Sequence, residues 1–407
     1  MSRLNRFGEI VGGSEHLVEL DAASLLALAR ATTGLDDLGE AEWPGWTETY
    51  ERQVTAIAAE GRLHLLGRVL TRAEVLRVLQ TWLRLQDLWR REPQILRIPV
   101  AEPLFVVGPP RTGTTILLEL LALDPQLRAP LAYEALHPFA ERGTPEQRRL
   151  LSEPEQEFWS DIHPPFLTMH ELASDLPCEC VHFLMYDFSG PYWSMGYDAP
   201  SFTGWQLEHL ETLDRVYRLH RRMLQTFDHE APDPTPRRWL LKSPFHVSTL
   251  PALFAEYPDA RVVHTHRDPR RFLASLVSIL SAIRFMRSDD VDVAGLAAIM
   301  QLTYRMFLEG TIDQRVSGEI PDERIVDSHF TTLMRNPVAS LRATYERLDL
   351  DWPSGHDAVI TAYLAAKPQG KHGEHAYSLA DVGLDPDSVA SDFARYTTHY
   401  GIEPEVR

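Results

Sequence analysis

The sequence contains little cysteine and no long apolar run. Its two cysteines, Cys178 and Cys180, are too few and too close together to form a disulfide framework, so we expect a reducing, cytoplasmic setting. No run of about 18 apolar residues is present, which argues against a membrane-spanning helix. Residues 1–13 also lack the apolar core of a signal peptide.

Basic residues are in the minority. The chain has 40 Lys and Arg against 58 Asp and Glu, which gives a formal net charge of -18 and a pI of about 5.4. This charge argues against nucleic acid and anionic membranes as partners, and an anionic ligand would need a local basic island. Hydrophobic residues make up 44% of the 407 residues, enough to form a large core.

The first part of the chain is predicted to be helical. Apolar residues recur at helical spacing in residues 17–29, 47–60 and 72–90, and prolines interrupt the pattern at 93 and 99. We therefore interpret residues 1–98 as a helical N-terminal segment packed on the rest of the chain.

Residues 99–407 are predicted to form an α/β domain. Short apolar strands are expected at 104–107, 239–242 and 261–265, with helices at 114–123 and from 270 onward. This alternation predicts a parallel sheet flanked by helices. Between the first two strands, residues 130–203 are rich in proline and aromatic residues, and we interpret them as long loops that carry specificity.

A phosphate-binding loop is predicted at Gly108–Thr115. The segment Gly-Pro-Pro-Arg-Thr-Gly-Thr-Thr follows a strand, opens a helix and nearly fits the G-x-x-x-x-G-K-[ST] pattern, whose backbone N–H groups cradle phosphate. Thr114 takes the place of the pattern's lysine, which disfavours a kinase or ATPase, and Arg111 supplies a cation instead. The alternative is a Gly/Pro turn without a ligand.

A second anion site is predicted where the third strand ends. Arg261, His264, His266, Arg267, Arg270 and Arg271 form a basic island in an acidic chain. Arg267 opens a helix, and Ser275 follows it by eight residues. Open α/β sheets bind ligands at this edge, which favours an anion site. The alternative is a solvated helix end without a ligand, where basic residues are also common.

These segments resemble the sulfotransferases that use 3′-phosphoadenosine-5′-phosphosulfate (PAPS). Pro110–Thr115 resembles their 5′-phosphosulfate loop, and His266–Pro269 with Ser275 resembles their 3′-phosphate loop. Leu241–Pro244 is similar to the strand end that carries their second active-site lysine, and residues 370–373 are similar to their C-terminal basic loop. The resemblance extends from about residue 99 to residue 400, and it is greatest to bacterial members with an added helical N-terminus.

The resemblance implies a PAPS site and its residues. The donor would be held by Arg111, Thr112, Gly113, Thr114, Thr115, Arg267, Ser275, Lys371, His372 and Gly373. Two departures are Arg111, where most members have lysine, and Ile116, where an aromatic residue is frequent. Adenine stacking is therefore expected from Phe330.

In-line sulfuryl transfer requires cations at the leaving phosphate and a base at the acceptor hydroxyl. Arg111 and Lys242 are the expected cations, so no metal is expected. The base is expected to be Glu134 or His246, each of which could instead be structural. Cys178, Cys180 and His182 match no strong zinc pattern, and we expect them to be buried structural residues.

The acceptor is expected to be a small or lipid-like hydroxyl compound. Its pocket would use aromatic residues that could equally be core: Trp159, Phe166, Tyr186, Phe188, Tyr192 and Trp193. A homo-oligomer is left open. The alternatives are a P-loop kinase or ATPase, a noncatalytic nucleotide-binding protein, and a family member that eliminates the sulfated alcohol.

Overall fold

A five-stranded parallel sheet lies at the centre of the computed structural model, which describes residues 2–140, 145–232, 235, 237–367 and 378–405. The strand order is β2-β3-β1-β4-β5. The strands are β1 (Leu104–Val107), β2 (Leu127–Arg128), β3 (Arg238–Lys242), β4 (Arg261–His266) and β5 (Ile325–His329). All neighbouring pairs are parallel, as in the predicted α/β fold.

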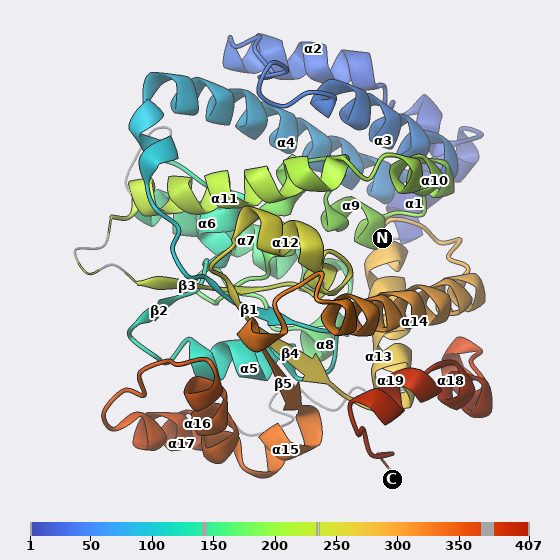
Figure 1. The fold of residues 1–407 in the computed structure, drawn as a ribbon. Coiled ribbons are helices and arrows are strands. Elements are labelled where there is room, and N and C mark those ends of the chain that lie inside the picture. Colours follow the sequence, from blue (N-terminus) through green and yellow to red (C-terminus); the bar gives the residue numbers. More distant parts are fainter. Residues whose placement is uncertain (1, 141–144, 233–234, 236, 368–377, 406–407) are drawn as a thin grey trace.

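Helices cover both faces of the sheet (Figure 1). In the first half of the chain they are α1 (Ser2–Ile10), α2 (Ala22–Thr33), α3 (Trp46–Glu60), α4 (Leu65–Arg91), α5 (Thr114–Leu121), α6 (Ala132–Leu136), α7 (Pro145–Ile162), α8 (Phe166–Met169), α9 (Pro191–Gly196) and α10 (Pro200–Glu208). In the second half they are α11 (Thr212–Glu230), α12 (Leu250–Glu256), α13 (Pro269–Phe285), α14 (Val293–Ser317), α15 (Phe330–Arg335), α16 (Pro337–Arg347), α17 (His356–Ala366), α18 (Pro386–Asp392) and α19 (Ala394–His399).

Strand β1 shows how the sheet is buried on both sides. Its side chains alternate between the two faces, as the pleat requires. Phe105 and Val107 join a large core with α4, α11 and α12, whereas Leu104 and Val106 join a smaller core with α5, α16 and α17. All four residues are completely buried, which explains the continuous apolar run in the sequence.

The predicted strands and helices of the sheet are confirmed, with small shifts at their ends. Strands β2 and β5 were not predicted. Strand β2 has two residues, too few for a pattern, and β5 contains Asp327, Ser328 and His329, which interrupt its apolar character. Both lie at the edges of the sheet.

The prediction of loops across 130–203 was wrong, because this segment contains several helices, including the 18-residue α7. The prolines misled the prediction. Pro191 and Pro200 lie in the first turns of α9 and α10, where the missing N–H costs no hydrogen bond.

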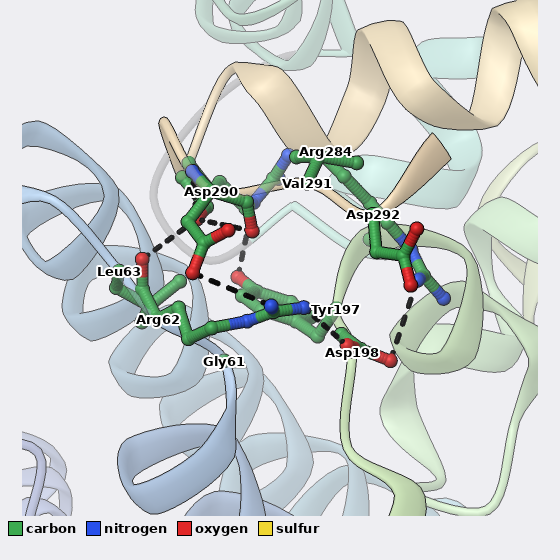
Figure 2. A pocket seen from close by; sticks show the side chains of 12 residues that line it. Gly61, Arg62, Leu63, Tyr197, Asp198, Arg284, Asp290, Val291 and Asp292 are labelled. Carbon is green, nitrogen blue, oxygen red and sulfur yellow. Dashed lines mark hydrogen bonds and ion pairs between the residues drawn. The ribbon is translucent and has the colours of Figure 1, made fainter. Parts of the chain in front are cut away.

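The N-terminal helices pack at one end of the molecule, with the sheet between them and α15–α17 (Figure 1). Figure 2 shows one connection, in which Arg62, between α3 and α4, pairs with Asp198 (2.7 Å) and Asp290 (3.3 Å). Because the large core includes residues from both sides of residue 98, the division of the chain there stays a prediction. None of the described helices is long and apolar enough to cross a bilayer.

Candidate active site

The loop between β1 and α5 has the backbone shape of a phosphate cradle. Gly108, Arg111 and Gly113 have positive φ angles of 142°, 69° and 90°. A Cβ atom at Gly108 would clash with Thr265, and one at Gly113 would lie 2.8 Å from the Phe330 ring. Arg111 is therefore held in a conformation that is unfavourable for a side-chain residue, as is common at functional sites.

The loop is fixed from inside by Thr112. Its hydroxyl donates to the carbonyl of Pro109 (2.7 Å) and lies 2.6 Å from the Thr265 hydroxyl. The side chain is buried, and the donor contact expected of Thr112 stays a prediction. Thr114 is also buried, whereas Thr115 is exposed at the start of α5.

The two predicted phosphate loops meet in the structure. Arg111 Nε donates to Ser275 Oγ (2.9 Å), and Arg267 Nη1 donates to the carbonyl of Arg111 (2.9 Å). Arg111 Nη1 also donates to the carbonyl of Met169 at the end of α8 (3.2 Å). Residues predicted separately from two motifs thus form one basic site at the carboxyl ends of β1 and β4.

Arg267 lies against both an aromatic ring and a carboxylate. Its Cζ atom is 3.8 Å from the centroid of the Phe330 ring. Its Nε and Nη2 atoms donate to the two carboxylate oxygens of Glu405 (2.8 and 2.9 Å). The arginine predicted to bind the 3′-phosphate therefore already binds a carboxylate, in the bidentate geometry that arginine also offers to phosphate.

Lys242 ends β3 next to the phosphate loop. Its side chain is buried, donates to Thr115 Oγ1 (3.2 Å) and forms an ion pair with Glu179. Burial alone would raise the pKa of Glu179, but Lys242 lowers it, and the net pKa lies below the ordinary value. Glu179 is therefore a carboxylate at neutral pH.

A cavity of about 310 Å³ opens beside this ion pair. Its apolar lining consists of Leu70, Ala73, Leu136, Phe158, Trp159, Phe166, Leu172, Val181, Tyr192, Met195, Ile279 and Ile283. Its polar lining consists of Glu74, Arg77, Glu155, Gln156, His170, Glu179 and His182. Helix α4 forms one wall, so the N-terminal helices contribute directly to the site.

The aromatic residues named from the sequence divide between the two expected fates. Trp159, Phe166 and Tyr192 line the cavity. Tyr186, Phe188 and Trp193 are completely buried in the large core, where the Phe188 and Trp193 rings stack with centroids 4.6 Å apart.

Sequence reasoning missed the polar end of this cavity. Burial lowers the pKa of His170 to about 4 and also lowers that of His182, so both imidazoles are neutral at neutral pH. His182 Nδ1 lies 3.1 Å from the carbonyl oxygen of Glu179. A single acidic residue inside the mostly apolar run 177–185 was the available indication of this site.

Glu134, one expected base, has a structural environment. It is buried, accepts from Arg128 Nη2 (2.8 Å) through one carboxylate oxygen and accepts from the Leu131 N–H (2.9 Å) through the other. Both oxygens are thus occupied, and Glu134 is not among the described residues that line the cavity.

His246, the other expected base, is also not among the described residues that line the cavity. It is completely buried, and burial lowers its pKa to about 3. Its Nδ1 atom lies 2.8 Å from the Tyr217 hydroxyl. The described residues that line the cavity include other candidate bases. Lys371, His372 and Gly373 lie outside the described residues.

Comparison with known proteins agrees with this geometry. The sulfotransferase family model matches residues 103–354. Omega-hydroxy-beta-dihydromenaquinone-9 sulfotransferase Stf3 of Mycobacterium bovis and of Mycobacterium tuberculosis is 26% identical over 263 residues, which cover 61% of this chain and 63% of the relative. The chain thus matches less than two thirds of these relatives' length.

Two solved structures are similar over nearly the whole chain. Sulfotransferase STF9 from Mycobacterium avium has a TM-score of 0.79 at 25% identity, covering 95% of this chain and 98% of that one. Sulfotransferase STF1 from Mycobacterium tuberculosis has a TM-score of 0.76 at 26% identity, covering 93% and 100%. The family resemblance seen in the sequence is confirmed, and the chain belongs to the sulfotransferase family.

Proposed function

We propose that this protein transfers a sulfuryl group from PAPS to the hydroxyl of an apolar, lipid-like acceptor. The observation that carries the proposal is the position of the mostly apolar cavity, whose lining includes Glu179, the ion-pair partner of Lys242 beside the phosphate loop. A donor on the loop and an acceptor in the cavity would then face each other across Lys242 and Arg111.

The residues of the loops fit the donor. The positive φ angles of Gly108 and Gly113 let the loop backbone form a cradle, and Arg267 already binds the Glu405 carboxylate, which supports binding of an oxyanion there. Thr114, Thr115 and the backbone N–H groups at the start of α5 would hold the 5′ side, and Arg267 with Ser275 the 3′-phosphate. Phe330, beside Arg267, would stack on adenine. When bound, PAPS supplies the activated sulfuryl group.

Lys242 and Arg111 would stabilise charge that develops on the leaving phosphate. The chain's lysines are Lys242, Lys367 and Lys371, whereas its other basic residues are arginines. Lysine can release a proton to a leaving oxygen and arginine does not, which gives a reason for lysine at this position.

His170 is our proposed base, in place of Glu134 and His246. It lines the cavity, and Glu179, Lys242, His182 and Arg111 all lie close enough to influence its charge. The imidazole is neutral at neutral pH, so it can accept the proton of an acceptor hydroxyl. The Arg111 contact with the carbonyl of Met169 places His170 next to the donor loop.

The lining indicates the acceptor class. Twelve of the lining residues are apolar or aromatic, and most of them belong to α4, α7, α9 and α13, with single residues from α6 and α8. The Stf3 relatives carry a name that denotes a hydroxylated menaquinone acceptor, a lipid-like compound. We infer that the apolar part of the acceptor lies among these helices and that its hydroxyl lies at His170.

The test is a PAPS-dependent sulfation assay with a panel of isoprenoid, long-chain and phenolic alcohols, read by mass spectrometry. We expect PAPS-dependent products that gain one sulfuryl group, with apolar alcohols preferred over sugars. Ile279→Lys, which places a charge in the apolar lining, should raise KM for the acceptor more than KM for PAPS. Failure to bind PAPS or its product, together with binding of Mg-ATP, would overturn the proposal in favour of a kinase.

A further inference from the structure

Three potential metal ligands meet in the core outside the cavity lining. Cys180 belongs to η3 (Cys180–His182), His220 to α11, and His246 to η5 (Pro244–Ser248). All three are completely buried. The Cys180 sulfur and one ring nitrogen from each histidine lie within 4.8 Å of one another.

The hydrogen bonds of the two histidines use the Nδ1 atoms and leave the Nε2 atoms without a partner. His220 Nδ1 lies 2.7 Å from the Tyr257 hydroxyl, and His246 Nδ1 lies 2.8 Å from the Tyr217 hydroxyl. The Nε2 atoms of both histidines are buried without a hydrogen-bond partner. If each Nδ1 donates its proton to a tyrosine oxygen, both Nε2 atoms keep a lone pair that is available to a metal ion.

This pattern is costly unless a further group occupies it. A buried polar atom without a partner lacks the hydrogen bond that water would give it, so it destabilises the fold. Metal-binding histidines typically donate their other ring N–H to an oxygen, which fixes the tautomer and the ring orientation. The two tyrosines provide this support, and the Tyr217 hydroxyl lies 2.8 Å from the Thr249 hydroxyl.

We propose that Cys180, His220 and His246 bind a monovalent soft metal ion, copper(I), as a structural site. Thiolate and imidazole are ligands that copper(I) accepts. A thiolate and a monovalent cation sum to zero charge, which suits a site with no water-exposed atom. Zinc would leave a net positive charge in the core, and structural zinc sites usually have four protein ligands.

The thiol would lose its proton on binding. Burial raises the pKa of Cys180, so without a metal it is a neutral thiol, and the backbone N–H of Lys242 hydrogen-bonds to its sulfur. Coordination forms the copper–sulfur bond and releases the thiol proton to solvent while the chain folds, with no change of oxidation state. The bound ion would tie η3, and with it Glu179, to α11 and η5.

A second cluster makes a useful contrast. His264, His266 and Asp327 also gather three ligand atoms. There, His266 Nε2 already bonds Asp327 (2.8 Å), and Arg315 bonds both Asp327 oxygens (2.6 and 3.0 Å). The Asp327 carboxylate is thus already paired with His266 and Arg315, so we propose no metal ion at this cluster.

The experiment is to express the full chain in copper-supplemented and in zinc-supplemented medium. The proteins are purified without oxygen and dialysed against a copper(I) chelator, and retained metal is measured by mass spectrometry. Cys180→Ser and His220→Gln remove ligands, whereas Cys178→Ser changes a buried free cysteine two residues away and serves as the matched control. X-ray absorption of the wild-type protein reads the ligands without any substitution.

We expect stoichiometric copper in the wild type and in Cys178→Ser, with loss in Cys180→Ser and His220→Gln and with one sulfur and two nitrogen neighbours. No retained copper, equal copper in Cys180→Ser, or zinc alone in the site would each overturn the proposal. These outcomes do not depend on PAPS or on an acceptor, so they are separate from failure of the proposed reaction.

Discussion

The Glu405 carboxylate is bound to the arginine that we assign to the donor's 3′-phosphate. The residue follows α19, and its carboxylate accepts two hydrogen bonds from Arg267 and lies 3.8 Å from Arg271 Nε. Its backbone N–H donates to Asp268 (2.9 Å), which holds the segment in place. A phosphate that binds Arg267 must therefore displace this carboxylate, so Glu405→Gln should strengthen binding of 3′-phosphoadenosine-5′-phosphate (PAP).

The structure allows the size of this effect to be estimated. A hydrogen bond to a charged group contributes about 1.5–3 kcal/mol. The Arg267 and Glu405 side chains are 13% and 17% exposed, so solvent screens the pair only in part. A discount for screening and for side-chain ordering leaves about 1–2 kcal/mol. Since about 1.4 kcal/mol corresponds to a tenfold change, PAP should bind about 5- to 30-fold more tightly to Glu405→Gln.

Isothermal titration calorimetry of PAP without Mg²⁺ measures this change. Glu403→Gln removes the same charge from an exposed residue two positions earlier and is the matched control. Arg267→Ala should weaken PAP binding in either background. ADP lacks the 3′-phosphate, so its affinity should not change with Glu405→Gln.

Unchanged or weaker PAP binding in Glu405→Gln would refute the assignment of Arg267 to the 3′-phosphate. An equal gain in Glu403→Gln would show that net charge, rather than competition at Arg267, sets the affinity. A gain that extends to ADP would place the competing anion at the 5′ side of the site.

Three further predictions concern the cavity and the core. Lys242→Met should lower kcat about 10²–10³-fold, as loss of a transition-state cation or donor does. It should also lower Tm, because Glu179 is left unpaired. Adding Glu179→Gln should restore Tm but not kcat. His170→Asn should lower kcat about 10²–10⁴-fold with little change in PAP affinity. His182→Asn should lower kcat less. A larger loss of kcat in His182→Asn than in His170→Asn would assign the base to His182. Stability should fall as the pH is lowered from about 6.5 to about 4. Burial lowers the pKa of His170 and His266 to about 4, so in this range the unfolded chain binds more protons than the folded protein. Urea midpoints that stay constant over this range would contradict the prediction.

The donor loops could be predicted from the sequence because their structure is local. The strand, the glycines and the helix start lie within twelve residues of one another around Gly108, and the backbone itself forms the cradle. The second loop has the same property, since Arg267 and Ser275 lie on one helix and its approach. The parallel sheet places β1 beside β4 and so brings the two loops together, but the contact between Arg111 and Ser275 was not itself predicted.

The cavity beside Lys242 and Glu179 could not be predicted in this way. Its lining includes residues of α4, α6, α7, α8, α9, η3 and α13, and no two of these are neighbours by a repeating rule such as strand pairing. The expected bases, Glu134 and His246, stay predictions, and the surroundings of Glu134 were not predicted for a related reason. Glu134 has a suitable chemical identity, but Arg128 and the Leu131 N–H take both of its oxygens, and neither contact has a pattern in the sequence.

Cys180 illustrates the same limit and its consequence for reading short motifs. In the sequence, its neighbours Cys178 and His182 are the obvious partners, and their spacing fits no metal site. In the structure, His182 faces the cavity, while Cys180 faces His220 and His246, which lie 40 and 66 residues further along the chain. The 3₁₀ turn at η3 separates these directions, so residues two apart serve different sites. One short segment would thus place a carboxylate beside the reacting groups and a thiol in the core, which explains why a structural ion bound to Cys180 would also fix the position of Glu179.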